Sequence, residues 1–194
     1  KLRVVISGAG AAGTAVAKLL RAAGVTDIVL LDRSGVIHSG RKDLNSHKRE
    51  LSTLTNPRRI TGDLTSALRD ADVFIGLSGK SLLTAATVST MNPRAIVFAM
   101  ANPDPEILPD EATAGGAMVV ATGRSDFPNQ INNALVFPGI FRGALDKGVT
   151  KITEATKLRA ARALAALVHR PTPTNIIPDL LDRRVVTAVA KAVR

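Results

Sequence analysis

The stretch VVISGAGAAG at residues 4–13 decides the fold class of this chain. Apolar residues at 2–7 read as a short strand, and the glycines of a full G-x-G-x-x-G pattern, Gly8, Gly10 and Gly13, follow at once. In such a turn the first glycine permits the tight bend, the second lets a pyrophosphate approach the backbone, and the third lets helix and strand pack closely. Free N–H groups at the start of the next helix favour phosphate. The stretch therefore predicts a dinucleotide-binding turn.

The residues after this turn complete one strand–helix–strand unit. The pattern predicts a helix over 11–23 that stops at Gly24, and a second strand over 28–31 that ends at Asp32. Together these elements occupy about 30 residues, the usual length of a βαβ unit. Both strands are continuous runs of Val, Ile and Leu, which favours a parallel sheet buried on both faces.

Strands and helices continue to alternate after a polar, basic and irregular stretch at 33–62. This order predicts an α/β fold, a Rossmann-type, doubly wound and mostly parallel sheet with helices on both faces. We treat residues 1–194 as one domain, in which 170–194 form a proline-rich link and a last helix. The further strands are expected at 73–77, 95–100 and 118–121, and the further helices at 63–70, 84–91, 109–114, 140–147, 153–169 and 183–193.

Composition excludes several function classes. The chain has no cysteine, so disulfides and thiolate metal sites are ruled out, and we expect a cytoplasmic location. No apolar run approaches the roughly 20 residues of a membrane helix, so we expect no membrane partner. The net charge of +10 could attract nucleic acid, but the basic residues are dispersed and Trp and Tyr are absent. We favour a solvated basic face over a nucleic-acid surface. Because Lys1 stands next to the first strand, we expect a domain of a longer chain.

Asp32 bears on the choice of coenzyme. It follows the glycine turn at about the spacing at which an acid accepts hydrogen bonds from the adenosine ribose. A carboxylate there also repels a 2′-phosphate, so we expect NAD rather than NADP. Arg33, Arg41 and Lys42 stand against this expectation, because any of them could neutralise an added phosphate.

Polar residues also follow the later strands, at the edge of the sheet where ligands bind. Ser78 and Gly79 are small enough to let a coenzyme ribose lie against a strand end, although a plain turn is the alternative. Asn102 is held extended by Pro103, and its amide can donate to a carboxylate and accept from a hydroxyl. A loop-initiating Asn is the alternative there.

Three further groups of polar residues are candidates for a site. The amide cluster NQINN at 129–133 can bind carboxylates or a nicotinamide carboxamide without adding charge. Asp104 and Glu106 are separated by proline and have no evident third partner, so we assign no metal site to them. The histidines lie far apart in polar surroundings, and none is assigned as a base: His38, His47 and His169.

Taken together, these segments resemble the malic enzyme family in its bacterial-type form, over nearly the whole chain. The segments at 96–107 and 121–146 are the most specific part of the resemblance, because they match the family at many residues outside the coenzyme pattern. The segments are VVISGAGAAGTAVAKLL (4–20), LLDRSGVIHSGR (30–41), ADVFIGLSG (71–79), IVFAMANPDPEI (96–107) and ATGRSDFPNQINNALVFPGIFRGALD (121–146).

The resemblance implies an oxidoreductase that oxidises L-malate with NAD or NADP and decarboxylates the oxaloacetate to pyruvate and CO₂, with Mg²⁺ or Mn²⁺. It implies that Asn102, and Asn132 or Asn133, contact substrate and nicotinamide. It also implies a homodimer or higher homo-oligomer for the full-length protein. The coenzyme residues that it implies are Gly8, Gly10, Ala11, Ala12, Gly13, Asp32, Arg33, Ser78, Gly79 and Asn102.

The chain departs from the family in what it lacks. The family's catalytic Tyr and Lys and its metal carboxylates come from the domain before the glycine turn, and this chain contains no Tyr. We therefore expect no catalytic or metal-binding residue here, and an inactive fragment. Phe127, where many relatives have Tyr, is interpreted as a packing change. A malolactic-type enzyme with the same domain, and a non-catalytic NAD-binding or assembly module, remain as alternatives.

Overall fold

The computed structural model describes residues 1–194 and divides them into two compact units, Lys1–Gly123 and Arg124–Arg194. Each unit has a hydrophobic core of its own, so each is described by itself. The prediction from the sequence was a single domain over residues 1–194, without this division. None of the helices combines the length and the hydropathy needed to cross a bilayer.

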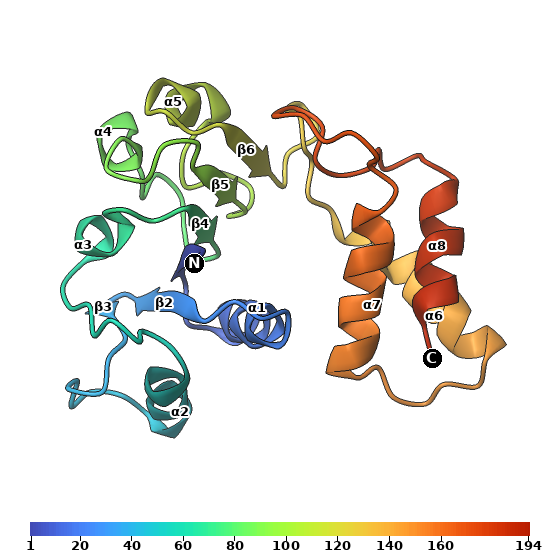
Figure 1. Ribbon diagram of the computed structural model, residues 1–194, viewed down its shortest axis with the longest axis horizontal. Helices are drawn as coiled ribbons and strands as arrows, with labels where there is room; N and C mark the ends of the chain where they lie inside the picture. Colours follow the sequence, from blue (N-terminus) through green and yellow to red (C-terminus); the bar gives the residue numbers. More distant parts are fainter. The chain divides into compact units, whose positions relative to one another are not determined.

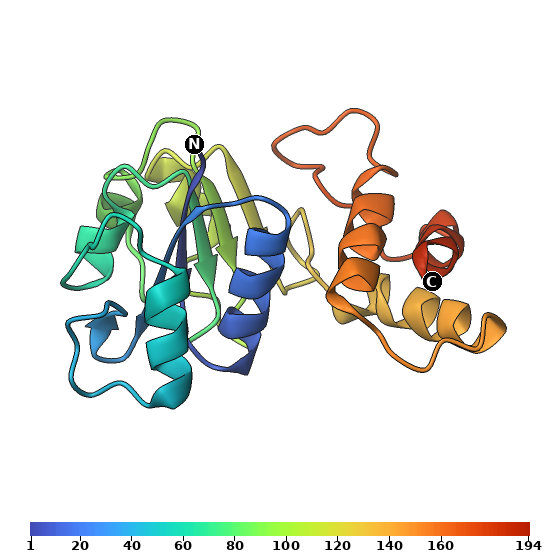
Figure 2. The same ribbon diagram turned by 60° about the horizontal axis from the view of Figure 1, so that its bottom comes forward.

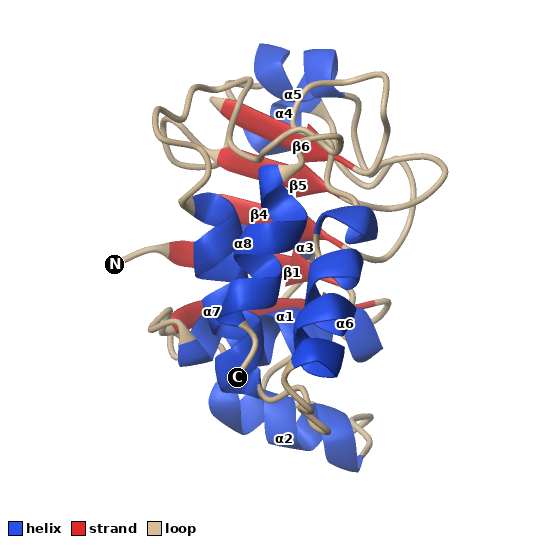
Figure 3. Cartoon of the chain, turned by 90° about the vertical axis from the view of Figure 1, so that its right-hand side faces the viewer, coloured by secondary structure: helices blue, strands red, loops and turns tan.

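The first unit is built on a six-stranded sheet with the order β3-β2-β1-β4-β5-β6. Figure 3 shows these strands side by side. All neighbouring strands are parallel except β2 and β3, so the predicted fold class is confirmed. The order changes direction between β1 and β4, the switch point at which such sheets bind ligands. The strands are β1 (Arg3–Ser7), β2 (Asp27–Asp32), β3 (Gly35–Val36), β4 (Val73–Gly76), β5 (Ile96–Ala99) and β6 (Val119–Thr122).

Helices cover both faces of this sheet (Figures 1 and 2). Ile6 and Leu30 face a core that includes α1 and α2, whereas Val5 and Phe74 face a core that includes α3, α4 and α5. Each such fully buried side chain contributes about 1.5–3 kcal/mol relative to an exposed one. The helices are α1 (Ala11–Ala22), α2 (Ser46–Leu54), α3 (Leu64–Leu68), α4 (Ala85–Val88) and α5 (Pro109–Ala114).

The stretch 33–62, which was expected to be irregular, contains β3 and α2, so that expectation is wrong. Helix α2 escaped the sequence pattern because Leu51 is its one buried residue, which leaves no apolar periodicity. Its start is marked instead by Asn45, whose side chain accepts a hydrogen bond from the Lys48 N–H at 2.9 Å. Helix α2 is held to α1 by polar contacts, among them Thr14 Oγ1 to His47 Nε2 at 3.0 Å.

The second unit is a small helical assembly. Its helix α6 begins at Phe137, three residues before the predicted start at Ile140. Two glycines allow α6 to approach α8 closely, since a Cβ on Gly139 would lie 2.6 Å from the Val189 Cβ and one on Gly143 would meet Ala190. Its elements are the 3₁₀ turn η1 (Asn133–Leu135) and the helices α6 (Phe137–Asp146), α7 (Glu154–Ala165) and α8 (Arg184–Ala192).

Candidate functional site

A groove of about 1570 Å³ lies at the carboxyl ends of β1, β2 and β4 in the first unit. The loops after these three strands line it, because parallel strands bring their carboxyl ends to one edge of the sheet. The structure thus gathers most of the predicted coenzyme residues in one place, and Ala11, Ala12 and Gly13 follow in the first turn of α1. The predicted residues that line the groove are Gly8, Gly10, Asp32, Arg33, Ser78 and Gly79.

The glycine turn is tightly enclosed by its neighbours. Gly8 has φ +119°, a left-handed conformation that favours glycine, and its N–H donates to the Leu31 carbonyl at 2.9 Å. A Cβ on Gly8 would lie 2.8 Å from the Leu77 carbonyl oxygen. A Cβ on Gly13 would overlap the carbonyl oxygen of Gly8. These two positions therefore need glycine to bring β2, β4 and α1 together around β1.

Gly10 meets a different requirement. It is the N-cap of α1, it provides no side-chain cap, and a Cβ built on it would have no atom within 4 Å. The first N–H groups of a helix lack partners within the helix, and the helix dipole makes this end favourable for anions. The open space beside Gly10 and the uncapped N–H groups fit a pyrophosphate of a dinucleotide.

The Asp32 carboxylate is enclosed by cations. Arg41 binds it through both guanidinium nitrogens, Nη1 to Oδ1 at 2.7 Å and Nη2 to Oδ2 at 3.2 Å, and Lys48 Nζ lies 2.6 Å from Oδ2. The Ser34 N–H donates to Oδ1 at 2.9 Å. Four donors fill the roughly four acceptor positions of a carboxylate. Arg41 also pairs with Asp43, and the Asp32 and Arg41 side chains are each 10% exposed.

These contacts determine the charge state at this end of the groove. Burial raises the pKa of the Asp32 carboxyl, but the hydrogen bonds from Arg41, Lys48 and the Ser34 N–H outweigh burial and bring that pKa below its usual value. Asp32 is therefore ionised at neutral pH, with its charge balanced by its partners. Arg33 and Lys42, which the sequence also suggested, are exposed and do not pair with the Asp32 carboxylate.

A second cavity, of about 360 Å³, lies between the loops after β4 and β5. Ser78, Gly79 and the exposed Asn102 line it, so the structure brings these three predicted residues together. Ser78 is joined to the end of β1 by a hydrogen bond between its Oγ and Ser7 Oγ at 2.8 Å. Ser78 and Gly79 line both hollows, which makes the loop after β4 their common wall.

The amide cluster lies in the second unit, where two of its members have structural roles. Asn129 is buried, its Nδ2 donates to the Pro173 carbonyl at 2.8 Å, and its Oδ1 accepts from the Ile176 N–H at 2.9 Å. Asn132 caps η1 by accepting from the Ala134 N–H at 2.9 Å. Asn133 is exposed at the start of this turn.

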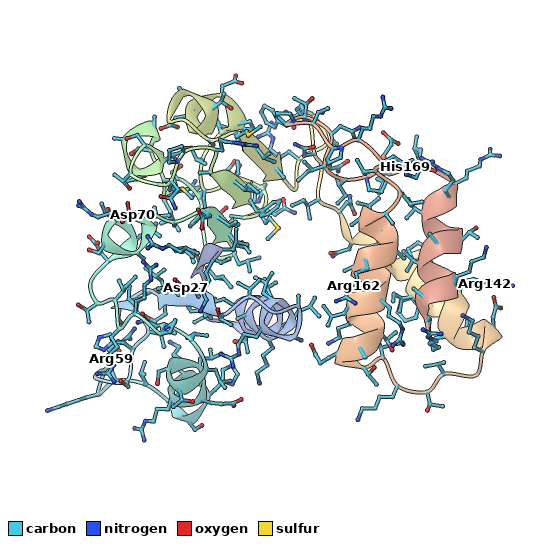
Figure 4. The ribbon with its side chains drawn as sticks, in the orientation of Figure 1. Asp27, Arg59, Asp70, Arg142, Arg162 and His169 are labelled. Carbon is cyan, nitrogen blue, oxygen red and sulfur yellow. The ribbon has the colours of Figure 1, made fainter.

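The remaining candidates are scattered. His38 lines the groove, whereas His47 binds Thr14 and His169 is exposed in the segment after α7 (Figure 4). The Arg124 guanidinium lies over the Phe127 ring, with its Cζ 5.2 Å from the ring centroid. Figure 4 also shows labelled arginines on different elements, in keeping with a dispersed basic charge. No three His, Asp or Glu side chains come together as metal ligands would.

Comparisons with known proteins place these observations in a family. The family profile described as "Malic enzyme, NAD binding domain" matches residues 1–194. The bifunctional malic/malolactic enzyme of Bacillus subtilis is 51% identical over 99% of this chain and 48% of its own length. The NADP-dependent malic enzyme of Halomonas elongata is 45% identical over 98% of this chain and 49% of its own. The NAD-dependent malic enzyme of Thermotoga maritima has a TM-score of 0.95 at 43% identity, over 100% of this chain and 51% of that structure. The chain thus spans about half the length of these relatives.

Proposed function

We propose that this chain, which belongs to the malic enzyme family as its sequence predicted and spans the NAD-binding domain, binds the coenzyme of a longer protein. That protein oxidatively decarboxylates L-malate to pyruvate and CO₂. The observation that carries the proposal is the groove at the switch point, where the glycine turn, Asp32 and Ser78–Gly79 line one continuous surface. The malic enzymes it resembles over half their length support the choice of substrate.

The residues of this chain bind and orient. The first-turn N–H groups of α1 hold the pyrophosphate, and Gly10 leaves room for it. Gly79 leaves room for the ribose on the nicotinamide side. Asn102 supplies an amide contact to a carboxylate of malate or to the carboxamide of nicotinamide. The family resemblance assigns the same kind of contact to Asn132 or Asn133 of the second unit. When bound, the coenzyme accepts the hydride from C2 of malate.

The acid–base and metal roles fall to other residues. The chain has no Tyr, and its Asp, Glu and His side chains form no cluster of three. In this proposal the chain therefore holds no catalytic metal of its own. The catalytic Tyr and Lys, and the ligands for Mg²⁺ or Mn²⁺, belong in this proposal to the remaining half of the longer protein.

NAD is the preferred coenzyme in this proposal, and NADP can also bind. The expectation that Asp32 repels a 2′-phosphate is weakened by Arg41 and Lys48, which balance its charge inside the groove. When NAD binds, a ribose hydroxyl can donate to the Asp32 carboxylate in place of Lys48. When NADP binds, the 2′-phosphate can pair with Lys48 and Arg41 in place of the Asp32 carboxylate. The second exchange breaks more ion pairs, which favours NAD.

The malolactic outcome remains a second candidate, because the Bacillus relative carries both activities in its name. In that reaction malate becomes lactate without net release of NADH. Incubation of the full-length protein with malate and NAD separates the two candidates. Accumulation of NADH and pyruvate supports malic activity, and lactate without NADH supports malolactic activity.

The chain itself provides the direct test. Isothermal titration is expected to show saturable NAD binding to the 194-residue chain, together with no NADH formation when malate and Mg²⁺ are added. Absence of NAD binding would overturn the proposal. Malate oxidation by the chain alone would overturn the assignment of the catalytic residues to the other half.

A further inference from the structure

A fully buried carboxylate, that of Glu106, lies between the loops after β4 and β5. The residue is 0% exposed, and its carboxyl group fills the space that a Cβ on Gly76, the last residue of β4, would need. Burying an acid costs free energy unless hydrogen bonds satisfy it. Apolar packing therefore does not explain why this carboxyl group is buried, whereas its hydrogen bonds do.

The two carboxylate oxygens take one backbone N–H from each loop. Oε2 accepts from the Ala101 N–H at 3.0 Å, and Oε1 accepts from the Ser78 N–H at 3.4 Å. Burial raises the pKa of Glu106, and these backbone donors partly offset the increase. Glu106 belongs to the loop after β5, so its side chain joins the start of its own loop, at Ala101, to the loop after β4, at Ser78.

The main chain beside Glu106 strengthens the same bridge. Its own carbonyl accepts from the Leu83 N–H at 3.1 Å, and the Pro105 carbonyl accepts from the Ser81 N–H at 3.2 Å. Of these four hydrogen bonds, three join Pro105 and Glu106 to the loop after β4, and the fourth, from Ala101, closes their own loop. Because the segment cannot move without breaking them, the loops have a defined spacing.

The residues that Glu106 binds lie in the wall of the second cavity. Ser78 and Ala101 both line that cavity, and each is followed by a residue assigned to the site, Gly79 and Asn102 respectively. Glu106 itself does not line it. The carboxylate therefore holds the residue before each proposed contact and leaves the contact residue free to meet a ligand.

We propose that Glu106 is a positioning residue that sets the distance between Gly79 and Asn102 for the nicotinamide half of the coenzyme, an inference that rests on the function proposed above. It touches neither coenzyme nor substrate. Replacement of one oxygen by an NH₂ group leaves the N–H of Ser78 or of Ala101 without an acceptor and loosens the loop at that residue. Ligands that reach these loops then lose affinity, and ligands that end at the pyrophosphate do not.

The test compares NAD with ADP, which carries the adenosine and the two phosphates but no nicotinamide ribose. Two variants disturb the bridge differently: Glu106→Gln removes an acceptor, and Gly76→Ala fills the space of the carboxyl group. Each is expected to weaken NAD binding about tenfold, with the affinity for ADP within twofold of the original. Glu111→Gln is the matched control, an exposed carboxylate that accepts from the Ala85 N–H at 3.3 Å, and should change neither affinity.

The outcomes separate this inference from the proposed function. Parallel losses for NAD and ADP, or unchanged NAD affinity in Glu106→Gln, would overturn the positioning role while NAD binding by the original chain stands. Should the original chain bind no NAD, the proposed function falls, and this inference with it. If a variant unfolds, hydrogen exchange of the original chain decides: NAD must slow the Ser78 and Ala101 amides together, and slowing of one alone contradicts the bridge.

Discussion

The groove and the second cavity, which meet at the loop after β4, hold their polar groups in different ways. On the β2 side, Asp32, Arg41 and Lys48 form ion pairs between side chains. On the β4–β5 side, the backbone N–H groups of two loops share the buried carboxylate of Glu106. Side-chain ion pairs can exchange partners with a ligand while the backbone stays in place. The backbone bridge can change only if a loop moves.

This difference separates two properties of the site. In the function proposed here, the choice between NAD and NADP belongs to the β2 side, where single side-chain charges can be altered while the backbone stays in place. The placement of the nicotinamide belongs to the β4–β5 side, where a substitution also alters loop geometry. The glycine turn after β1 lies between them in the sheet order and serves both.

The largest expected effect comes from the turn itself. A carboxylate at Gly10 has room in the fold and can cap α1, but it occupies the place of the pyrophosphate and repels it. Gly10→Asp should weaken NAD binding by about 100-fold or more, about 2.7 kcal/mol, with the melting temperature unchanged or slightly raised. Calorimetric titration and thermal unfolding measure both quantities.

The control for this variant adds the same charge at another helix start. Thr153 caps α7 in the second unit, so Thr153→Asp should keep NAD affinity within twofold. Equal losses in the two variants would show that net charge, rather than the site, reduces binding. Unchanged NAD affinity in Gly10→Asp would remove the pyrophosphate from the turn.

A smaller effect should be confined to the β2 side. Lys48→Ala removes a cation from the groove and should weaken NADP about tenfold while NAD changes by less than threefold, since a charge-assisted hydrogen bond contributes about 1.5–3 kcal/mol. Lys42→Ala removes an equal charge from an exposed neighbour outside the groove lining, and should alter neither affinity beyond twofold. Equal effects of Lys48→Ala on NAD and NADP would contradict the separation of the two sides.

The smallest effect is a difference in the pH dependence of stability. The folded-state pKa of Asp32 is lowered, so its ion pairs stabilise the fold above an ordinary carboxyl pKa of about 4, and this stability is lost as pH falls through the lowered pKa. The folded-state pKa of Glu106 is raised, so its contribution is present below about 4.3 and is lost as pH rises through the raised pKa.

The two carboxyls should therefore change the slope of stability with pH in opposite directions. Urea unfolding from pH 3 to 7 measures this slope. Asp32→Asn should remove part of the increase in the free energy of unfolding as pH rises from 3. Glu106→Gln should remove part of the decrease in that free energy at higher pH. If both variants changed the slope with the same sign, the contrast between an ion-paired and a desolvated carboxyl would be wrong.

Most of the first unit could be predicted from its sequence because its strands are buried on both faces. Continuous apolar runs such as VVIS (4–7) and IVLL (28–31) mark such strands without ambiguity. Helix α2 could not be predicted in this way, since its polar surface hides it, and Lys48 was missed with it. The N-cap Asn45 was the one local indication.

The site was predicted unevenly for a similar reason. The glycine turn, Asp32 and Asn102 stand directly after strands, so sequence position alone places them at the ligand-binding edge. Glu106 lies inside the loop after β5, seven residues from the end of that strand, and its sequence position suggested only a metal ligand. Its role depends on a tertiary contact with Gly76, and a glycine at the end of a buried strand was the one hint in the sequence.

We propose that one dinucleotide spans the groove and the second cavity, and amide chemical shifts of the ¹⁵N-labelled chain test this most directly. Titration with NAD should shift the amides of residues 8–13, of Asp32, of Ser78–Gly79 and of Ala101–Asn102 with a single dissociation constant. Titration with ADP should shift the first two groups and leave Ala101–Asn102 unmoved. Saturable NAD binding that left the Gly8–Gly13 amides unshifted, or that shifted the amides of only one of the two hollows, would contradict the account.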